Sequence, residues 1–542
     1  MAPISSKTPD SVSRYGNVKA NELEAHKEVK PEDIPGIVDG LRKTFASEVT
    51  YSVAWRKAQI KQLKKMLVER EEEIAAAVTE DIGKSAFESY ATEIGLVIAE
   101  CDTALSHIDE WVKPVATGNS ALNIPSWSQL RYDPLGVVLV MAAWNYPVQL
   151  ALAPMVAALA GGNCVCLKPA SWANATSNVL AKLLPQYMDN SAVQVVEGNR
   201  HITSALLEEA WSKIIFTGSG FVGRIVAQAA AKHLTPVVLE LGGKSPCIVD
   251  KSVDVEHAAQ RLVWGSFVNS GQTCVRPDHC LVHEDVADDF IKELQRQVLK
   301  MYGEDPQKTE WFSRLVNANA FDRLKSLVDE EQDRVVIGGK YDASDKYIAP
   351  TILDFGADME AFTSSGVMQD ELFGPILPVV RYRNLEDVID FVKNLITGKP
   401  LALYAYSKDN KFIETIKTRT TSGGLVINDN LMHLANHELP FGGVGASGTG
   451  SYHGHHGFKC MSHEKACLQK SQILDQSPAF KPLLQARFPP YTPTKQALVR
   501  MFSNHHINML VNLPMPLLRV GLKAVLLYLC LRLAGFNIVR QA

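Results

Sequence analysis

Apolar residues follow the spacing of helix faces in the first part of the chain. Between residues 53 and 78 they recur every three or four positions, with Lys, Arg and Glu between them: Ile60, Leu63, Leu67 and Ile74. The stretch 93–111 repeats this pattern. Such spacing predicts helices that bury one face and expose the other.

From residue 131 onward, short apolar runs alternate with longer segments of small and apolar residues. The runs predicted as strands are 131–143, 164–167, 213–217 and 237–241. The segments predicted as helices between them include 149–160 and 221–233. Strands that alternate with helices of this length form βαβ units, so the pattern predicts an α/β fold with a mainly parallel sheet.

The composition is that of an ordinary soluble globular protein with two or three domains. Of the 542 residues, 46% are hydrophobic and 21% are charged. A net charge of −4 gives no reason to expect a nucleic-acid partner. Nine irregularly spaced cysteines argue against a disulfide framework and for a reducing compartment.

Cysteine and histidine do not combine into a predicted metal site. Cys164 and Cys166 would face the same side of a strand, as core residues. His453, His455 and His456 lack a partner cluster and are interpreted as part of a solvated loop. We therefore expect no metal.

The two ends of the chain differ in character. Residues 1–30 are polar, with neither the basic start nor the apolar core of a signal peptide, so we expect a loose N-terminal segment over 1–38. Residues 476–542 carry eight basic and no acidic residues, together with several apolar runs. A basic, apolar tail on an acidic body predicts that the tail contacts an anionic surface, such as a membrane.

The tail is nevertheless a poor membrane span. Pro514 and Pro516 interrupt it, and only eight uncharged residues separate Lys523 from Arg532. Eight residues give about 12 Å of helix, whereas a span needs about 20 apolar residues. The pattern favours a helix that lies in the membrane interface. The alternative is a helix packed against the body or against a partner subunit.

Cys274 is the candidate nucleophile. It ends the uncharged stretch Gly271-Gln272-Thr273-Cys274. A thiolate can add to a carbonyl, hold the product as a thioester and release it to water. The alternative is a buried, inert cysteine, which is the more common state of this residue type.

A glycine-rich turn follows the predicted strand 213–217. Gly218, Ser219, Gly220 and Gly223 fit the pattern G-x-G-x-x-G between a strand and a helix, as a dinucleotide site requires, although a tight turn gives the same pattern. Glu240 follows 22 residues after Gly218, near the distance at which an acid can bind a ribose. At a strand end it could instead be a general base for water, or simply an ion-paired residue.

Three further residues could complete such a site. Asn145 could donate its amide to an oxyanion, or it could be a turn residue ahead of Pro147. Lys168 ends a strand, where a cation can meet ribose hydroxyls or phosphate. Glu371 is a second carboxylate, close to the aromatic Phe373.

Five short motifs carry a resemblance to one known family. They are Trp144-Asn145-Tyr146-Pro147, Phe216-Thr217-Gly218-Ser219, Glu240-Leu241-Gly242-Gly243-Lys244, Gly271-Gln272-Thr273-Cys274 and Glu371-Leu372-Phe373-Gly374-Pro375. Together they resemble the aldehyde dehydrogenase superfamily over roughly residues 40–470. Asn428-Asp429, Leu431-Met432-His433 and the stretches 439–445 and 451–454 resemble its class 3 and fatty aldehyde dehydrogenase branch.

The resemblance implies a domain organisation. It consists of a Rossmann-like parallel-sheet cofactor domain, a second α/β catalytic domain and a small bridging β segment. The expected boundaries are 39–241 for the dinucleotide-binding domain, with the bridging β segment near 113–131, 242–450 for the catalytic domain, 451–475 for a bridging or oligomerisation segment and 476–542 for the tail. A homodimer is also implied.

The resemblance further implies a role for each candidate. Cys274 would be the nucleophile, Glu240 the base for the deacylating water rather than a ribose ligand, and Asn145 an oxyanion donor together with the Cys274 backbone N–H. The implied cofactor-binding residues are the pyrophosphate loop Gly218, Ser219, Gly220 and Gly223, Lys168 at the adenosine ribose, and Glu371 with Phe373 at the nicotinamide ribose.

One position departs from the family. Where the family usually has Lys-Pro-Ser-Glu, this chain reads Lys168-Pro169-Ala170-Ser171. The family's Glu favours NAD because it binds the ribose 2′-hydroxyl and repels a 2′-phosphate. Ser171 carries no charge, so we expect NAD as the cofactor, with NADP tolerated.

The expected reaction is the oxidation of a long, apolar aldehyde to its acid through a thioester on Cys274. A fatty aldehyde and an apocarotenal such as β-apo-4′-carotenal, a substrate of some fungal members of this branch, both fit a tail that would hold the protein on the cytoplasmic side of an intracellular membrane. A membrane-tethered, catalytically weak interaction protein on the same fold is the alternative. The presence of Cys274 and Glu240 argues against it.

Overall fold

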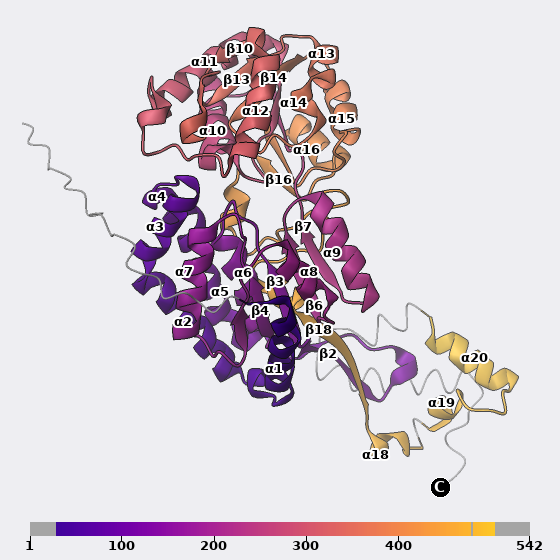
Figure 1. Cartoon of the computed structure of the whole chain (residues 1–542). Coiled ribbons are helices and arrows are strands. Elements are labelled where there is room, and N and C mark those ends of the chain that lie inside the picture. Colours follow the sequence, from indigo (N-terminus) through magenta and orange to yellow (C-terminus); the bar gives the residue numbers. More distant parts are fainter. Residues whose placement is uncertain (1–28, 479–480, 505–542) are drawn as a thin grey trace, which may run out of the picture.

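The computed structural model describes residues 29–478 and 481–504. Within them the chain forms two α/β lobes and a long β arm, seen in Figure 1 as a lower lobe, an upper lobe and an extension at the lower right. The predicted α/β class with parallel sheets is confirmed.

The first lobe contains a six-stranded sheet in the order β17-β7-β6-β3-β4-β5. Its strands are β3 (Val137–Met141), β4 (Cys164–Lys168), β5 (Val193–Val195), β6 (Lys213–Thr217), β7 (Val237–Glu240) and β17 (Gly448–Thr449). All neighbours are parallel except β17 with β7. The carboxyl ends of five strands therefore meet at one edge, where α/β proteins bind ligands.

Helices cover both faces of this sheet. They are α1 (Ile34–Ala46), α2 (Val53–Glu69), α3 (Glu71–Ile82), α4 (Ala86–Ser89), α5 (Gly95–Trp111), α6 (Gln149–Ala160), α7 (Asn174–Tyr187), α8 (Arg200–Glu208) and α9 (Gly220–Lys232). Val138 and Val140 of β3 belong to the core cluster that contains α6. Val137 and Leu139 belong to the cluster that contains α1, α8 and α9, so successive residues of β3 face opposite layers.

The second lobe has a seven-stranded sheet in the order β10-β13-β14-β9-β8-β15-β16. Its strands are β8 (Pro246–Val249), β9 (His279–His283), β10 (Val335–Ile337), β13 (Thr351–Asp354), β14 (Ile376–Tyr382), β15 (Ala402–Tyr406) and β16 (Gly424–Ile427). Only β10 runs antiparallel to its neighbour. The strands β11 (Tyr341–Asp342) and β12 (Tyr347–Ile348) form a separate pair.

Helices again flank this second sheet. They are α10 (Val255–Phe267), α11 (Glu284–Tyr302), α12 (Ala318–Glu330), α13 (Met359–Ser364), α14 (Gly366–Gln369), α15 (Leu385–Lys393) and α16 (Asn410–Arg419). One cluster of buried apolar residues includes members from both lobes, among them Leu152 of α6 and Val263 of α10. The two lobes therefore share part of their core.

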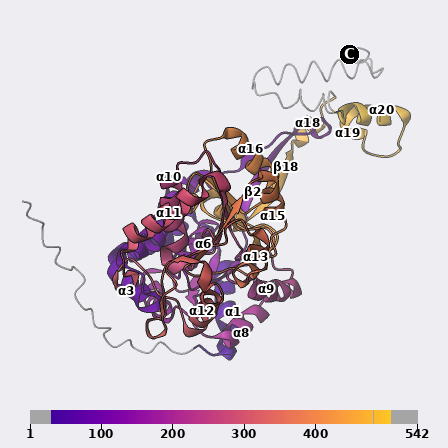
Figure 2. The same ribbon diagram turned by 90° about the horizontal axis from the view of Figure 1, so that it is seen from above.

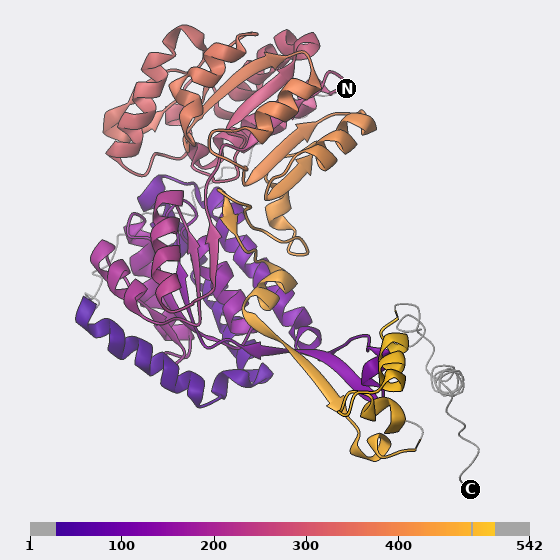
Figure 3. The same ribbon diagram turned by 90° about the vertical axis from the view of Figure 1, so that its right-hand side faces the viewer.

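The arm is a three-stranded antiparallel sheet of β1 (Val115–Ala116), β2 (Ser126–Pro134) and β18 (Ser462–Lys470). The helix α17 (Gly454–Cys460) leads into β18. At the far end lie α18 (Gln472–Asp475), α19 (Lys481–Gln485) and α20 (Pro493–Phe502), which Figures 2 and 3 show projecting away from the lobes. Buried apolar residues of α19 and α20, with Ala121 beside them, form a small core there: Leu484, Leu498 and Phe502.

Several expected elements differ from the observed ones. The expected strand 131–143 is two strands in different sheets, because Gly136 adopts a φ of 138° and turns the chain between β2 and β3. The expected helix over 53–78 breaks at Arg70, whose φ and ψ of −118° and 21° are not helical. Helix α1 begins at Ile34, inside the segment 1–38 expected to be loose, and it buries Ile34 and Val38.

The interpretation of the histidines as a solvated loop was wrong, because His455 and His456 lie on helix α17, which His453 immediately precedes. The His453 side chain is buried, with its ring stacked on Phe441 at 5.3 Å and edge-on to Tyr452 at 4.6 Å. Burial lowers the pKa of His453 to about 4. Aromatic neighbours account for this burial. The fold brings these residues together, and the local sequence does not reveal them.

The apolar part of the tail, residues 509–542, lies outside the described residues. In residues 29–478 and 481–504, no helix combines the length and the apolar character that crossing a membrane requires.

Candidate active site

Cys274 follows a turn with unusual backbone angles. Asn269, Ser270 and Gly271 have φ values of 56°, 52° and 71°, all in the left-handed region. Non-glycine residues rarely adopt this conformation, and its strain persists only where surrounding contacts hold it. Any Cβ on Gly271 would lie 2.3 Å from the Gly374 carbonyl oxygen, so this position requires glycine.

Buried hydrogen bonds hold the nucleophile loop. The Gln272 amide donates to the carbonyl oxygens of Asn269 at 3.1 Å and Arg314 at 2.9 Å, and its oxygen accepts from the Val316 N–H at 2.9 Å. The Tyr146 hydroxyl lies 2.5 Å from Thr273 Oγ1. The residues before Cys274 are therefore fixed from both lobes.

Asn145 reaches the nucleophile loop from the turn that follows β3. It is 3% exposed, and its Nδ2 donates to the Gln272 carbonyl oxygen at 3.0 Å. The Asn269 amide donates in turn to the Asn145 carbonyl oxygen at 2.8 Å. Because a carboxamide has two N–H bonds, the second bond of Asn145 can serve a ligand beside Cys274.

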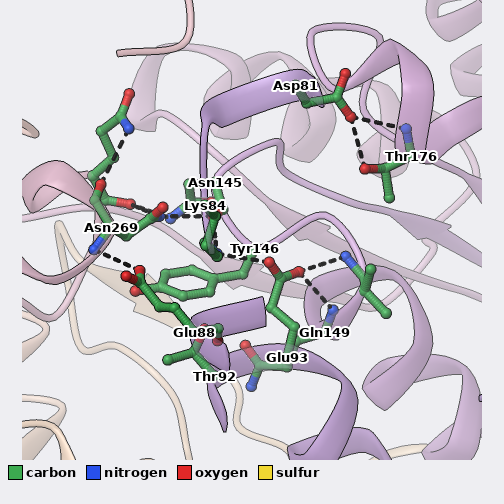
Figure 4. A network of polar contacts seen from close by, with 12 residues as sticks. Asp81, Lys84, Glu88, Thr92, Glu93, Asn145, Tyr146, Gln149, Thr176 and Asn269 are labelled. Carbon is green, nitrogen blue, oxygen red and sulfur yellow. Dashed lines mark hydrogen bonds and ion pairs between the residues drawn. The ribbon is translucent and has the colours of Figure 1, made fainter. Parts of the chain in front are cut away.

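A buried charge network supports the Asn145 turn (Figure 4). Lys84 and Glu93 form an ion pair at 2.6 Å with both side chains fully buried, and Lys84 also approaches the Asn145 carbonyl oxygen at 3.4 Å. Glu93 accepts from the Val148 N–H at 2.8 Å. Glu88 accepts from the Asn269 N–H at 2.8 Å, so the carboxylate holds one residue of the left-handed turn.

The sequence analysis missed these three charged residues. Lys84, Glu88 and Glu93 are spaced like solvated charges on a helix. Apart from the Lys84–Glu93 pair itself, the backbone groups that they contact lie from 55 to 181 positions away along the chain.

Glu240 lies at the end of β7 and is 2% exposed. Neither of its carboxylate oxygens has a hydrogen-bond partner among the described residues. Burial raises the pKa of Glu240 well above its usual range. A buried carboxyl of this kind is rare in a stable fold, and it marks a place where water or a ligand binds.

Cys274, Glu240 and Glu371 lie close enough to interact electrostatically. Burial, and then the negative charges of Glu371 and Glu240, raise the pKa of the Cys274 thiol. Hydrogen bonds from the backbone N–H groups of Cys274 and Val275 lower this pKa. The structure therefore brings the predicted nucleophile and both predicted carboxylates to one site, with Asn145 beside it.

The segment that carries Glu371 packs against the backbone after β7. A Cβ on Gly242 would lie 1.9 Å from Glu371 Oε2, and the Gly243 N–H donates to the same carboxylate. Burial and the charge of Asp278 raise the pKa of Glu371 to about 8. Phe373 meets Trp144 edge-on at 5.4 Å.

A second buried ion pair, missed by the sequence analysis, fixes this segment. Lys244 pairs with Asp278 and donates to the carbonyl oxygens of Val367 at 2.7 Å and Asp370 at 3.1 Å. Asp278 accepts from the Leu372 N–H at 3.0 Å. Lys244 stands in the motif that contains Glu240, which is the one sequence signal for it.

The turn from β6 into α9 fits a dinucleotide pyrophosphate. A Cβ on Gly218 would lie 2.5 Å from the Phe216 ring, and one on Gly223 would lie 2.6 Å from Leu241, whereas the space at Gly220 is open. Ser219 caps the 13-residue helix α9 by accepting from the Val222 N–H at 3.4 Å. Small residues at a helix N-terminus allow phosphate to approach backbone N–H groups.

Lys168 lies at the same sheet edge, at the end of β4. It is 6% exposed, and its ammonium donates to the Pro169 carbonyl oxygen at 3.0 Å. The Gly218 N–H donates to the Glu240 carbonyl oxygen at 3.0 Å, which joins the glycine turn to the strand that carries the candidate base. The predicted cofactor residues therefore border the Cys274 site.

Comparison with known proteins agrees with this arrangement. A model of the aldehyde dehydrogenase family matches residues 5–467. Aldehyde dehydrogenase family 3 member H1 of Arabidopsis thaliana is 41% identical over 488 residues, which are 90% of this chain and 98% of the relative. The dimeric, NADP-preferring aldehyde dehydrogenase of Rattus norvegicus is 41% identical over 462 residues, 85% of this chain and 98% of the relative.

Among solved structures, the substrate-bound state of Staphylococcus aureus AldH is similar in fold and sequence. Its TM-score is 0.82 at 37% identity, over 87% of this chain and 99% of that chain.

A glycine turn at the carboxyl edge of a parallel sheet, beside a cysteine and buried carboxylates, is typical of an NAD(P)-dependent oxidoreductase. The chain belongs to the aldehyde dehydrogenase family, and its relatives lie in class 3. It is an enzyme that oxidises an aldehyde to a carboxylic acid with NAD or NADP.

Proposed function

We propose that this enzyme oxidises long, apolar aldehydes, of the fatty or apocarotenoid type, at a membrane surface, with Cys274 as the nucleophile and Glu240 as the base. The observation that carries the catalytic assignment is the buried Glu240 carboxyl, which has no hydrogen-bond partner in the described part of the chain and acts electrostatically on the Cys274 thiol. The apolar substrate class rests on the basic, apolar tail of the sequence.

In the first step the Cys274 thiolate adds to the aldehyde carbon. The second N–H of the Asn145 amide and the Cys274 backbone N–H donate to the oxyanion that forms. Because Asn145 is bonded to the Gln272 carbonyl oxygen, its amide is already oriented before the substrate arrives. The dinucleotide, when held at this site, would supply the hydride acceptor that converts the adduct on Cys274 into a thioester.

In the second step the thioester on Cys274 is hydrolysed. Glu240, as carboxylate, removes a proton from a water molecule, which attacks the thioester carbon and releases the acid. The site keeps Glu240 buried without a partner in the described part of the chain, so a water molecule can be its first hydrogen-bond donor.

Lys168, the Gly218–Gly223 turn and Glu371 would hold the dinucleotide. Lys168 would contact the adenosine ribose. The backbone N–H groups at the start of α9 would contact the pyrophosphate, and Glu371, with Phe373 nearby, would contact the nicotinamide ribose. The first two assignments follow from the cation and the helix N-terminus at one sheet edge.

Rapid-mixing kinetics with hexadecanal test the catalytic assignment. We expect Glu240→Gln to retain a burst of reduced cofactor close to one per site, with steady-state turnover lowered about a hundredfold or more, because the thioester forms but is not hydrolysed. Cys274→Ala should show neither burst nor turnover. Normal turnover of Glu240→Gln would contradict the assignment of the base.

The membrane surface is supported by the described part of the tail. Phe488 and Tyr491 are 50% and 77% exposed, and Arg487 and Lys495 are near them in sequence. Exposed aromatic rings beside basic side chains suit the interface of an anionic membrane. A homodimer, with the protein on the cytoplasmic side of an intracellular membrane, belongs to the same proposal.

Vesicle sedimentation tests the membrane contact. We expect the full chain to sediment with vesicles of phosphatidylcholine and phosphatidylserine, and much less with phosphatidylcholine alone. The matched activity assay compares hexadecanal and an apocarotenal with hexanal. Equal kcat/KM for hexanal and the long aldehydes would contradict the proposed substrate class.

A further inference from the structure

Glu197 emerges next to Lys168 at the carboxyl edge of the first sheet. The strands β4 and β5 are parallel neighbours, with Leu167 opposite Val195. The Val196 N–H donates to the Leu167 carbonyl oxygen at 2.8 Å, so the register continues past the end of β5. Residues 168 and 197 therefore leave adjacent strands at the edge where the dinucleotide turn lies.

The Glu197 carboxylate is held in place. The Ser177 hydroxyl of α7 donates to Glu197 Oε1 at 2.7 Å, and Ser177 itself is buried. Gly198 follows with a φ of 141°, and a Cβ there would lie 2.5 Å from Ile202. Glu197 is only partly buried, so its second carboxylate oxygen is available to a ligand at the sheet edge.

Glu197 and Lys168 influence each other electrostatically. Burial lowers the pKa of Lys168 to about 8, and the negative charge of Glu197 is the influence that opposes this shift. The two side chains are therefore close enough to interact, although they do not form a direct ion pair. A ligand hydroxyl between them could accept from the ammonium and donate to the carboxylate.

Ser171, two residues beyond Pro169, is exposed and carries no charge. In dinucleotide-binding α/β folds, an acid beside the adenosine ribose binds the 2′-hydroxyl of NAD, whereas a 2′-phosphate needs a cation. Glu197 supplies an acid from the neighbouring strand, which revises the expectation, drawn from Ser171 alone, that NADP is tolerated.

We propose that Glu197 binds the adenosine ribose and discriminates against the 2′-phosphate of NADP, in place of an acid at position 171. This inference rests on the proposed function, because it requires a dinucleotide at Lys168. A phosphate monoester carries a charge of about −1.5 to −2 at neutral pH, so a carboxylate next to it weakens binding by repulsion.

Equilibrium binding of NAD and NADP, measured by titration calorimetry without aldehyde, tests the inference independently of turnover. We expect Glu197→Gln to lower the Kd for NADP at least about tenfold and to change the Kd for NAD by less than about threefold. Adding Ser171→Glu to Glu197→Gln should restore the discrimination, because it returns a carboxylate to the ribose.

Glu208→Gln is the matched control. Glu208 is an exposed carboxylate on α8 that pairs with Lys232, and its loss changes the net charge equally. Ser177→Ala keeps the charge of Glu197 but removes its anchor, and it should lower the Kd for NADP less than Glu197→Gln does. Unfolding temperatures verify that each variant is folded.

The results distinguish a failure of the proposed role of Glu197 from a failure of the proposed function. An unchanged ratio of the two Kd values in Glu197→Gln, or an equal change in Glu208→Gln, would overturn the role of Glu197 and leave the proposed function intact. A wild-type protein that bound neither dinucleotide would overturn the proposed function itself.

Discussion

At the scale of single residues, the site combines a thiol and two carboxyls whose burial disfavours their charged forms. The pKa values of Cys274, Glu240 and Glu371 are all raised, in each case first by burial. The proposed chemistry needs Cys274 as thiolate and Glu240 as carboxylate. Proton loss from both groups is therefore a condition for turnover.

This condition predicts the pH dependence of activity. The folded-state pKa values of Cys274 and Glu240 lie above their usual values, so the reactive, deprotonated forms accumulate only as pH rises. We expect kcat/KM for the aldehyde to increase with pH from about 6 to about 9. Initial rates at saturating NAD measure it, and a profile that falls over this range would contradict the assignment.

Glu88 offers a second test at this scale, because its carboxylate holds the strained turn before the nucleophile. We expect Glu88→Ala to lower kcat about tenfold, since the buried Asn269 N–H loses its acceptor. Glu88→Gln keeps an acceptor oxygen and should stay within about twofold of the wild type. Equal loss in both variants would show that the charge, and not the hydrogen bond, matters.

The same residue predicts a pH-dependent difference in stability. Burial raises the pKa of Glu88 to about 7 from a usual 4.5, so the folded state binds the proton more tightly than the unfolded state. The resulting stability is complete below about pH 4.5 and is lost as pH rises through 7. The measurement is the free energy of unfolding in urea at pH 5 and pH 8. At pH 8 we expect that of Glu88→Gln to exceed that of the wild type by at most about 3 kcal/mol.

At the scale of elements, the sequence predicts the strands that carry the site better than the contacts that hold it. The strands near 164–167 and 237–241 have the expected bounds within a residue, and they place Lys168 and Glu240 at one sheet edge. Local apolar runs are sufficient for this, because parallel strands bury both faces. Gly136 was not recognised as the break between two sheets, since a positive φ has no signature beyond the glycine itself.

The supporting ion pairs could not be predicted, because the backbone groups that they hold lie far away in the sequence. Glu93 lies within a π-helical turn, Tyr90–Ile94, and Lys84 precedes the start of α4, so no regular helix joins the two residues. A regular helix pattern therefore gives no reason to pair them. Lys244 and Asp278 are 34 positions apart and precede the neighbouring strands β8 and β9 of the second lobe.

At the scale of the whole molecule, the arm presents apolar side chains that the two lobes do not cover. Trp127 of β2 and Leu468 of β18 are 59% and 52% exposed. Large exposed apolar groups mark interaction surfaces in soluble proteins. The arm is therefore the surface on which we expect the proposed homodimer to form.

Light scattering after size-exclusion chromatography checks this expectation. We expect the double variant Trp127→Glu and Leu468→Glu to shift the protein from dimer to monomer, because the new charges would be buried at the interface. Phe221→Glu, a change at an exposed aromatic residue of α9, is the control and should leave the mass unchanged. A dimeric double variant would place the interface elsewhere.

The bonds around Cys274 also limit how the enzyme can move. Asn145, Tyr146 and Glu88 belong to the first lobe, and each is bonded to the loop of the second lobe that carries the nucleophile. A rigid-body opening of the lobes would break all three hydrogen bonds at once, so these bonds resist such an opening. We expect the sulfur and its oxyanion donor to keep their relative positions while cofactor and product exchange.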